Sequence, residues 1–291
     1  MEMRVLLTLA TLIAAAHGAH TYEGDAVVVA FGCHTSFRGK PEAEVYEECR
    51  NQLTHFEHQV TGALACARAH WDGAIVMVYP TPRFNRTIEH VTHYAFDERL
   101  LSSGIATQIY AAHASPFERS LWLDSDTCVM SNRFATYFTM LEWYDFVSVW
   151  ECCAVGAQGQ VPNDGWEPQT GAFAVRASAK PLLLAWAEFY DDGKRYSYSS
   201  ATQNALASVF LHSPYRFYVL QPQYNWRHWT MPLYDSSHIV GPVGSRDPVI
   251  LHTHALDGAH GGDRPRAAER LKDEVFCDTC KHGGYSDVCK T

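Results

Sequence analysis

The chain has 291 residues, of which 47% are hydrophobic and 19% are charged, and its formal net charge is −9. This composition suffices to bury one large core or two modest ones, and it excludes a disordered protein. Because the net charge is negative and no run of five or more basic residues occurs, we exclude nucleic acid as a partner and regard anionic membranes as poor candidates.

The first 18 residues have the pattern of a secretory signal peptide. Arg4 precedes an apolar run at residues 5–16, and residues 16–18 (AHG) fit a small-x-small cleavage site. About twelve apolar residues are fewer than the roughly 20 that cross a bilayer. We therefore expect a lumenal protein of the secretory pathway (endoplasmic reticulum or Golgi) or a secreted one, with membrane attachment only if the segment remains as an uncleaved anchor. A sequon at Asn85 fits that compartment.

The first expected elements are a strand and a helix. Residues 25–33 (DAVVVAFGC) form a continuous apolar run rich in valine, which is typical of a strand buried on both faces. Pro41 then opens a helix in which apolar residues from Val45 to Leu64 recur every three or four positions.

The same alternation continues along the chain. Residues 72–79 (DGAIVMVY) predict a second buried strand, residues from about 97 to 113 a second helix, and residues 119–124 (RSLWLD) a third strand. Strands and helices that alternate with short connections predict an α/β protein with a parallel sheet.

Two carboxylates, Asp124 and Asp126, directly follow the third strand. Ligands of open α/β sheets bind outside the carboxyl ends of the strands. In an extended chain Asp124 and Asp126 point to the same side and Ser125 to the other, so both carboxylates can face one hard divalent cation or one polar ligand. The alternative is a solvent-exposed turn after the strand, since Asp and Ser are common turn residues.

All nine cysteines follow the expected cleavage site, and an odd number cannot pair completely within one chain. Disulfides persist in an oxidising compartment, so we expect them in the mature protein. The last three cysteines, Cys277, Cys280 and Cys289, lie near His282. They fit a disulfide-stapled tail, a zinc site or a redox pair, of which we favour the disulfides.

The segment SPFERSLWLDSDT resembles the Asp-x-Asp segment of nucleotide-sugar-dependent glycosyltransferases with the GT-A fold. Further segments are similar to motifs of this family, in the family's order: EPQTGAFAVR (167–176), ATQNAL (201–206), LQPQYNWR (220–227) and PVILHTHALDG (248–258). The resemblance spans about residues 25–260. It implies a Rossmann-like α/β fold, with a mixed, mostly parallel sheet flanked by helices.

The resemblance also implies a metal-dependent hexosyl- or pentosyltransferase that moves a sugar from a nucleotide-diphosphate donor to an unidentified glycan or protein acceptor. Similarity to the glycogenin-like families implies retention of anomeric configuration. The cation, Mn2+ or another divalent ion, would be held by Asp124, Asp126 and His252, with His254 in reserve. Asp124 and Asp126 would serve catalysis together with Gln203. Mn2+ accepts such a mixed oxygen and imidazole set better than Ca2+ does.

Contacts with the donor follow from the same resemblance. The residues implied are Phe31, Asp124, Ser125, Thr170, Gly171, Gln203 and Asn225. In the family the missing side chain at Gly171 makes room for the donor sugar; alternatively, Gly171 permits a bulge or the close approach of another backbone. Three residues depart from the family pattern: Gln169 replaces Asn, Thr202 replaces Asp, and Gln108 replaces a frequent Lys.

These observations divide the chain into a signal peptide (1–18), a GT-A-like domain (19–262) and a cysteine-rich tail (263–291) that we expect to be an appendage. Two other functions remain open. Because of Gln169 and Thr202, the protein could be a non-catalytic nucleotide-sugar- or glycan-binding protein on the same fold. The other open function is that of a metal-dependent phosphohydrolase, although a second carboxylate-rich motif for a two-metal site is missing.

Overall fold

A computed structural model describes most of the chain from Tyr22 to residue 270. The described residues are 22–32, 40–84, 86–96, 109–110, 112–149, 168–196, 202–227, 248–252 and 261–270. Several sequence predictions fall outside them: the signal peptide (1–18), the sequon residue Asn85, Gln108, the reserve ligand His254 and the last three cysteines. Among the described helices, none combines the length and apolar character needed to cross a membrane.

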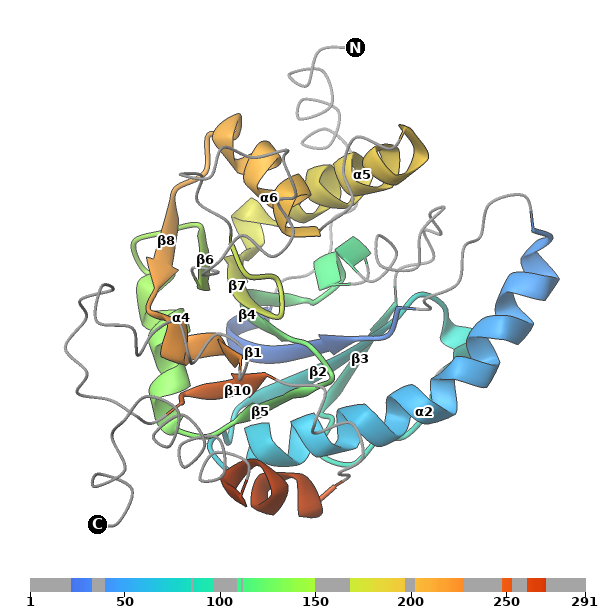
Figure 1. Cartoon of the computed structure of the whole chain (residues 1–291), viewed down its shortest axis with the longest axis horizontal. Coiled ribbons are helices and arrows are strands. Elements are labelled where there is room, and N and C mark those ends of the chain that lie inside the picture. The colour runs from blue at the N-terminus through green and yellow to red at the C-terminus, as the bar shows by residue number, and fades with distance from the viewer. Residues whose placement is uncertain are drawn as a thin grey trace, which may run out of the picture.

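The centre of the fold is a seven-stranded sheet with the order β3-β2-β1-β4-β7-β6-β8 (Figure 1). Its strands are β1 (Tyr22–Ala30), β2 (Ala74–Tyr79), β3 (His93–Phe96), β4 (Phe117–Leu123), β6 (Phe146–Val149), β7 (Ala172–Arg176) and β8 (Phe217–Leu220). β7 runs antiparallel to β4 and β6, and the other neighbouring pairs are parallel. The expected mixed, mostly parallel sheet is confirmed.

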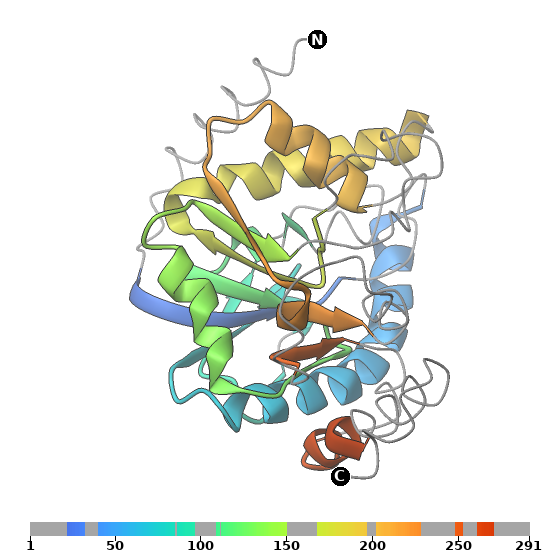
Figure 2. The same cartoon turned by 60° about the vertical axis from the view of Figure 1, so that its left-hand side comes forward.

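Helices cover both faces of this sheet (Figures 1 and 2). The long helix α2 (Glu42–Arg68) packs on one face, and α5 (Pro181–Tyr196) and α6 (Thr202–Leu211) pack on the other. The shorter helical elements are η1 (Pro82–Phe84), η2 (Asn132–Ala135), α4 (Thr136–Met140), η3 (Ala177–Ala179) and η4 (Pro222–Asn225). Of the helix expected at residues 97–113, only residues 109–110 and 112–113 are described, and they are helical.

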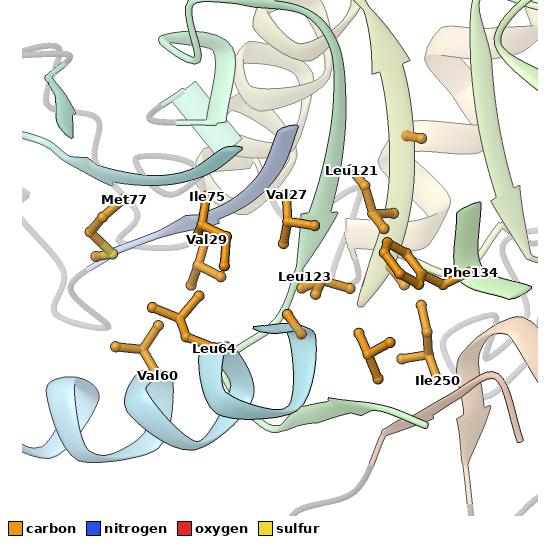
Figure 3. Packing of buried hydrophobic residues seen from close by; sticks show 14 of the residues in the cluster. Val27, Val29, Val60, Leu64, Ile75, Met77, Leu121, Leu123, Phe134 and Ile250 are labelled. Carbon is orange, nitrogen blue, oxygen red and sulfur yellow. The ribbon is translucent and has the colours of Figure 1, made fainter. Parts of the chain in front are cut away.

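The hydrophobic core explains why β1 reads as an unbroken apolar run. Val27 and Val29 point toward α2, where they lie beside Val60 and Leu64 (Figure 3). The residues between them belong to the core on the α5 and α6 side. Because both faces are covered, the strand needs no polar position. Ile250, from near the end of the chain, joins the α2-side core and thereby anchors a late segment beside β4.

The sequence analysis did not predict β3. This strand has four residues, pairs only with β2 at the edge of the sheet, and is half-buried throughout, so it shows neither an apolar run nor a clear alternation. The other predicted strands shift by a few residues: the run at 25–33 belongs to β1, that at 72–79 to β2, and that at 119–124 to β4.

A smaller, three-stranded sheet begins just after β4 and positions the site. Its order is β5-β10-β9, formed by β5 (Thr127–Val129), β10 (Ile250–His252) and β9 (Trp226–Arg227). β10 runs antiparallel to β5, with His252 opposite Thr127. Because Thr127 directly follows Asp126, this register brings His252 to the two carboxylates.

Candidate functional site

Asp124 and Asp126 lie in a turn between β4 and β5. The amide and hydroxyl of Thr127 both donate to the carbonyl oxygen of Asp124, at 3.2 Å and 2.7 Å. The extended geometry that we expected is therefore wrong. The alternative, a turn, is confirmed for the backbone, but the turn is not fully exposed to solvent, because Asp126 is only 8% exposed. The turn folds the chain back into the small sheet and carries the carboxylate of Asp126 inward.

The two carboxylates meet the imidazole of His252. Its Nε2 lies 3.2 Å from Oδ1 of Asp126 and 3.8 Å from Oδ2 of Asp124, and ligand atoms of the three residues lie within 4.8 Å of one another. Ligands about 2.1 Å from one cation lie about 3 to 4 Å apart, so the two distances from His252 are close to those of a divalent-ion site. The three residues named from the sequence as metal ligands are thus brought together and could hold such a cation.

Asp124 is oriented by its neighbours on the sheet. The indole Nε1 of Trp122 donates to its Oδ1 at 3.1 Å, which leaves Oδ2 on the side of His252. The amide of Asp124 donates to the carbonyl of Gly171 on the adjacent segment at 2.9 Å. The carboxylate at the end of β4 is therefore held by both a side chain and the main chain.

His252 is held from behind by Asn225, which is fully buried. Oδ1 of Asn225 lies 3.0 Å from Nδ1 of His252. An amide oxygen can only accept, so in this arrangement Nδ1 carries the hydrogen and Nε2 presents its lone pair to the carboxylates, as a metal ligand must. We expected Asn225 to contact the substrate; in the structure it lies behind a proposed metal ligand.

Gly171 makes space for the imidazole of His252. A Cβ atom at position 171 would overlap the His252 ring and would come within 3.1 Å of Asp124 Oδ2. The space that we expected to receive the donor sugar is thus occupied by the ring itself. Of the two sequence interpretations, close approach is the one that fits, although a side chain approaches rather than a backbone.

The remaining site residues have different surroundings. Ser125 donates through Oγ to Oε1 of Gln59 on α2 at 3.2 Å. Phe31 is 1% exposed and its ring packs on Phe56, so its side chain belongs to the core, and the expected contact with a nucleotide stays a prediction. Thr170 and Gln203 are half-buried, and their contacts with substrate stay predictions.

Gln169, which departs from the family pattern, is part of the interior. It is 1% exposed, and its carbonyl accepts from Oγ of Ser148 at 2.6 Å. This hydrogen bond uses the main chain, so it does not depend on the identity of the side chain at position 169. Thr202, the second departure, is the first residue of α6.

The sequence analysis missed two features beside the turn. One is a disulfide between Cys66 of α2 and Cys128 of β5; disulfides were expected in general, but this pairing was not predicted. The other is Arg264, whose guanidinium donates to the main chain of the turn. Gly62 of α2 packs against Arg264 and was a signal that the sequence offered for this contact. A glycine inside a helix costs about 1 kcal/mol relative to alanine and often has a packing reason.

No protein-family model matches the chain, and no curated protein is detectably similar in sequence. Solved structures are similar in fold. The galactosyltransferase LgtC, determined with donor and acceptor sugar analogues, superposes with a TM-score of 0.51 at 12% identity, over 87% of this chain and 95% of that chain. The glycosyltransferase GlyE of Streptococcus pneumoniae TIGR4 gives a TM-score of 0.50 at 14% identity, over 86% and 60%. The chain therefore has the GT-A-type fold of these glycosyltransferases.

Proposed function

We propose that this protein is a metal-dependent glycosyltransferase that moves a sugar, hexosyl or pentosyl, from a nucleotide-diphosphate donor to a glycan or protein acceptor. The observation that carries the proposal is the group of Asp124, Asp126 and His252 beyond the carboxyl end of β4, where ligands of such sheets bind. Its occurrence in a fold shared with known glycosyltransferases favours sugar transfer over other metal chemistry.

The exposure of the three ligands suggests how a donor would approach. The side chains of His252 and Asp126 are 5% and 11% exposed, whereas that of Asp124 is 33% exposed. His252 and Asp126 would hold the cation from the protein side, and the donor diphosphate would reach it beside Asp124. A bound Mn2+ or other divalent ion would stabilise the negative charge on the departing diphosphate as a Lewis acid.

We further propose that the protein transfers the sugar in the secretory pathway and with retention of anomeric configuration. The buried disulfide between Cys66 and Cys128 supports an oxidising compartment, because such bonds are rare in the cytosol. A mixed set of two carboxylates and one imidazole suits Mn2+ better than Ca2+. Nuclear magnetic resonance of the anomeric proton in a newly formed product would test retention, and an inverted product would overturn that part.

The function is tested by incubating the secreted protein with a panel of nucleotide sugars, with and without Mn2+. We expect release of nucleoside diphosphate that requires Mn2+ and is lost in Asp126→Asn, which keeps the side-chain shape but removes the charge. Asp72→Asn, at an exposed position, is the matched control and should behave as wild type. Mass spectrometry of acceptors would identify the sugar that is transferred.

Calorimetric titration of Mn2+ and a nucleoside diphosphate separates the alternatives. His252→Ala should weaken the same metal as Asp126→Asn, and the double variant should be non-additive because both residues serve one ion. Binding of both ligands without transfer would favour a non-catalytic binding protein, and release of inorganic phosphate would favour a phosphohydrolase. Wild-type binding by Asp126→Asn would remove the metal site from the proposal altogether.

A further inference from the structure

Arg264 is a buried cation at the turn that carries the two carboxylates. It is 0% exposed and lies in the helix at residues 263–270, beyond the domain boundary expected at residue 262. Its Nη1 donates to the carbonyl oxygen of Ser125 and, at 3.4 Å, to that of Thr127. These two carbonyls flank Asp126 in the chain.

The neighbouring helix α2 has a glycine where Arg264 packs. A Cβ atom at position 62 would overlap the Nε of Arg264. Burying a guanidinium is costly unless it is hydrogen-bonded, and a glycine within a helix is less stable than an alanine. Gly62 and Arg264 each lower the stability of the folded state when considered alone, yet they contact each other. This pairing indicates a specific role for the contact.

The same helix also contacts β10, the strand that carries His252. Ala268, one turn after Arg264, is 0% exposed and packs with Leu251 and with the Cys66–Cys128 disulfide. Leu251 precedes His252 in the chain. The helix lies beside α2 in both views (Figures 1 and 2). Its buried side contacts the carboxylate turn through Arg264 and the histidine strand through Ala268.

We propose that Arg264 is a positioning residue of the metal site: by fixing the carbonyls of Ser125 and Thr127, it holds the carboxylate of Asp126 against His252. The proposal deepens the proposed function and rests on the metal role of that site. Arginine suits the task because its planar group offers several donors in a fixed geometry and stays charged at every physiological pH. The functional domain then extends through residue 270.

The test compares Arg264→Met with Lys180→Met in calorimetric titrations of Mn2+. Lys180 is the matched control, because it is also buried and also donates to two main-chain carbonyls, at the opposite end of β4. We expect Arg264→Met to bind Mn2+ at least about 10-fold more weakly, as is usual when a group that orients a metal ligand is lost. Lys180→Met should lower the melting temperature and leave Mn2+ affinity unchanged.

Two further variants keep the test decisive if Arg264→Met does not fold. Gly62→Ala leaves the guanidinium in the chain but displaces it, so it should also weaken Mn2+ binding. Arg264→Lys keeps the charge, and it should recover part of the affinity lost in Arg264→Met. A Mn2+ affinity equal to wild type in a folded Gly62→Ala protein, in which the guanidinium is displaced, would overturn the proposal.

A measurement without metal separates this proposal from the proposed function. The amide of Thr127 donates to Asp124 within the turn. In metal-free protein its hydrogen exchange should be faster in Arg264→Met than in wild type, and unchanged in Lys180→Met. Faster exchange with weaker Mn2+ binding, in a protein that transfers no sugar, would support the positioning role and refute the function. Unchanged exchange and unchanged affinity would refute the positioning role whatever the reaction.

Discussion

The two ends of β4 are secured in the same way by different residues. At the amino end Lys180, 6% exposed, donates to the carbonyl oxygen of Ser115 and, at 3.1 Å, to that of Phe117. At the carboxyl end Arg264 donates to two carbonyls of the turn. In both places a buried cation satisfies main-chain acceptors that would otherwise lose their hydrogen bonds to water.

The difference between the two cations matches what each end does. Burial lowers the pKa of Lys180 from 10.5 to about 8, so its charge depends on pH in the alkaline range. Arg264 cannot lose its proton in a protein. The amino end needs only a secured strand, whereas the carboxyl end must keep two carboxylates in register with an imidazole. We infer that metal binding, not stability alone, explains the permanent charge at the carboxyl end.

The largest expected effect comes from filling the space beside His252. Gly171→Ala places a methyl group where the buried imidazole now lies, so the ring must leave its present position beside the two carboxylates. We expect Mn2+ affinity to fall by about 100-fold or more, the upper range for disturbed ligand shells. Gly262→Ala, whose Cβ would enter open space, is the control. Tight Mn2+ binding by a folded Gly171→Ala protein would show that the ring is not a ligand.

A smaller effect is expected from the residue behind the ring. Asn225→Leu removes the acceptor for Nδ1 of His252, so the imidazole loses its fixed orientation and tautomer, and Mn2+ affinity should fall by about 10- to 100-fold. Asn225→Asp retains an acceptor and should bind Mn2+ within a few-fold of wild type. Equal calorimetric dissociation constants for the Leu and Asp variants would argue against this role.

The smallest expected effect is a pH dependence of the stability that Lys180 contributes at the amino end of β4. Because the folded-state pKa of Lys180 is about 8 and the unfolded value is 10.5, the unfolded chain binds more protons between these values. The contribution of Lys180 to stability therefore rises as pH increases from about 8 to 10.5, with a slope below about 1.4 kcal/mol per pH unit, and is lost as pH falls through 8.

Urea unfolding at several pH values gives the measurement. The difference in unfolding free energy between wild type and Lys180→Met should change in favour of wild type as the pH is raised. The difference between wild type and Arg264→Met is the comparison for the carboxyl end, and it should not change with pH because neither side chain titrates in this range. A pH-independent difference for Lys180→Met would mean that the lysine keeps its ordinary pKa in the folded protein.

Sequence reasoning succeeded where a residue's surroundings follow from local pattern. The apolar spacing from Val45 to Leu64 predicted the buried face of α2, and the continuous run of β1 predicted burial on two faces. Asp124 and Asp126 were identified because two carboxylates directly after a buried strand point to a ligand site, whereas His252 was identified through the resemblance to the GT-A glycosyltransferases. A strand that is buried on both faces can be recognised from its continuous apolar sequence.

It failed where long-range pairing decides the geometry. The turn at Asp124–Asp126 exists because β5 folds back onto β10, a strand about two-fifths of the chain away in sequence. The roles of Gly171 and Asn225 depend on where the His252 ring packs, which no local pattern encodes. Arg264 was overlooked because it follows the last family-like motif, and a single arginine in a polar helix ordinarily faces solvent.

The short strand β10 affects how well the protein would resist local unfolding and proteolysis. Three residues carry His252 into the small sheet, from a part of the chain far from the carboxylates in sequence. A cation bound to both parts would act as a reversible cross-link that closes the intervening loop. By mass action an ion at 100 times its dissociation constant stabilises the closed form by about 2.7 kcal/mol. When manganese is scarce, β10 and the helix at residues 263–270 would open more often, and proteases would begin their attack there.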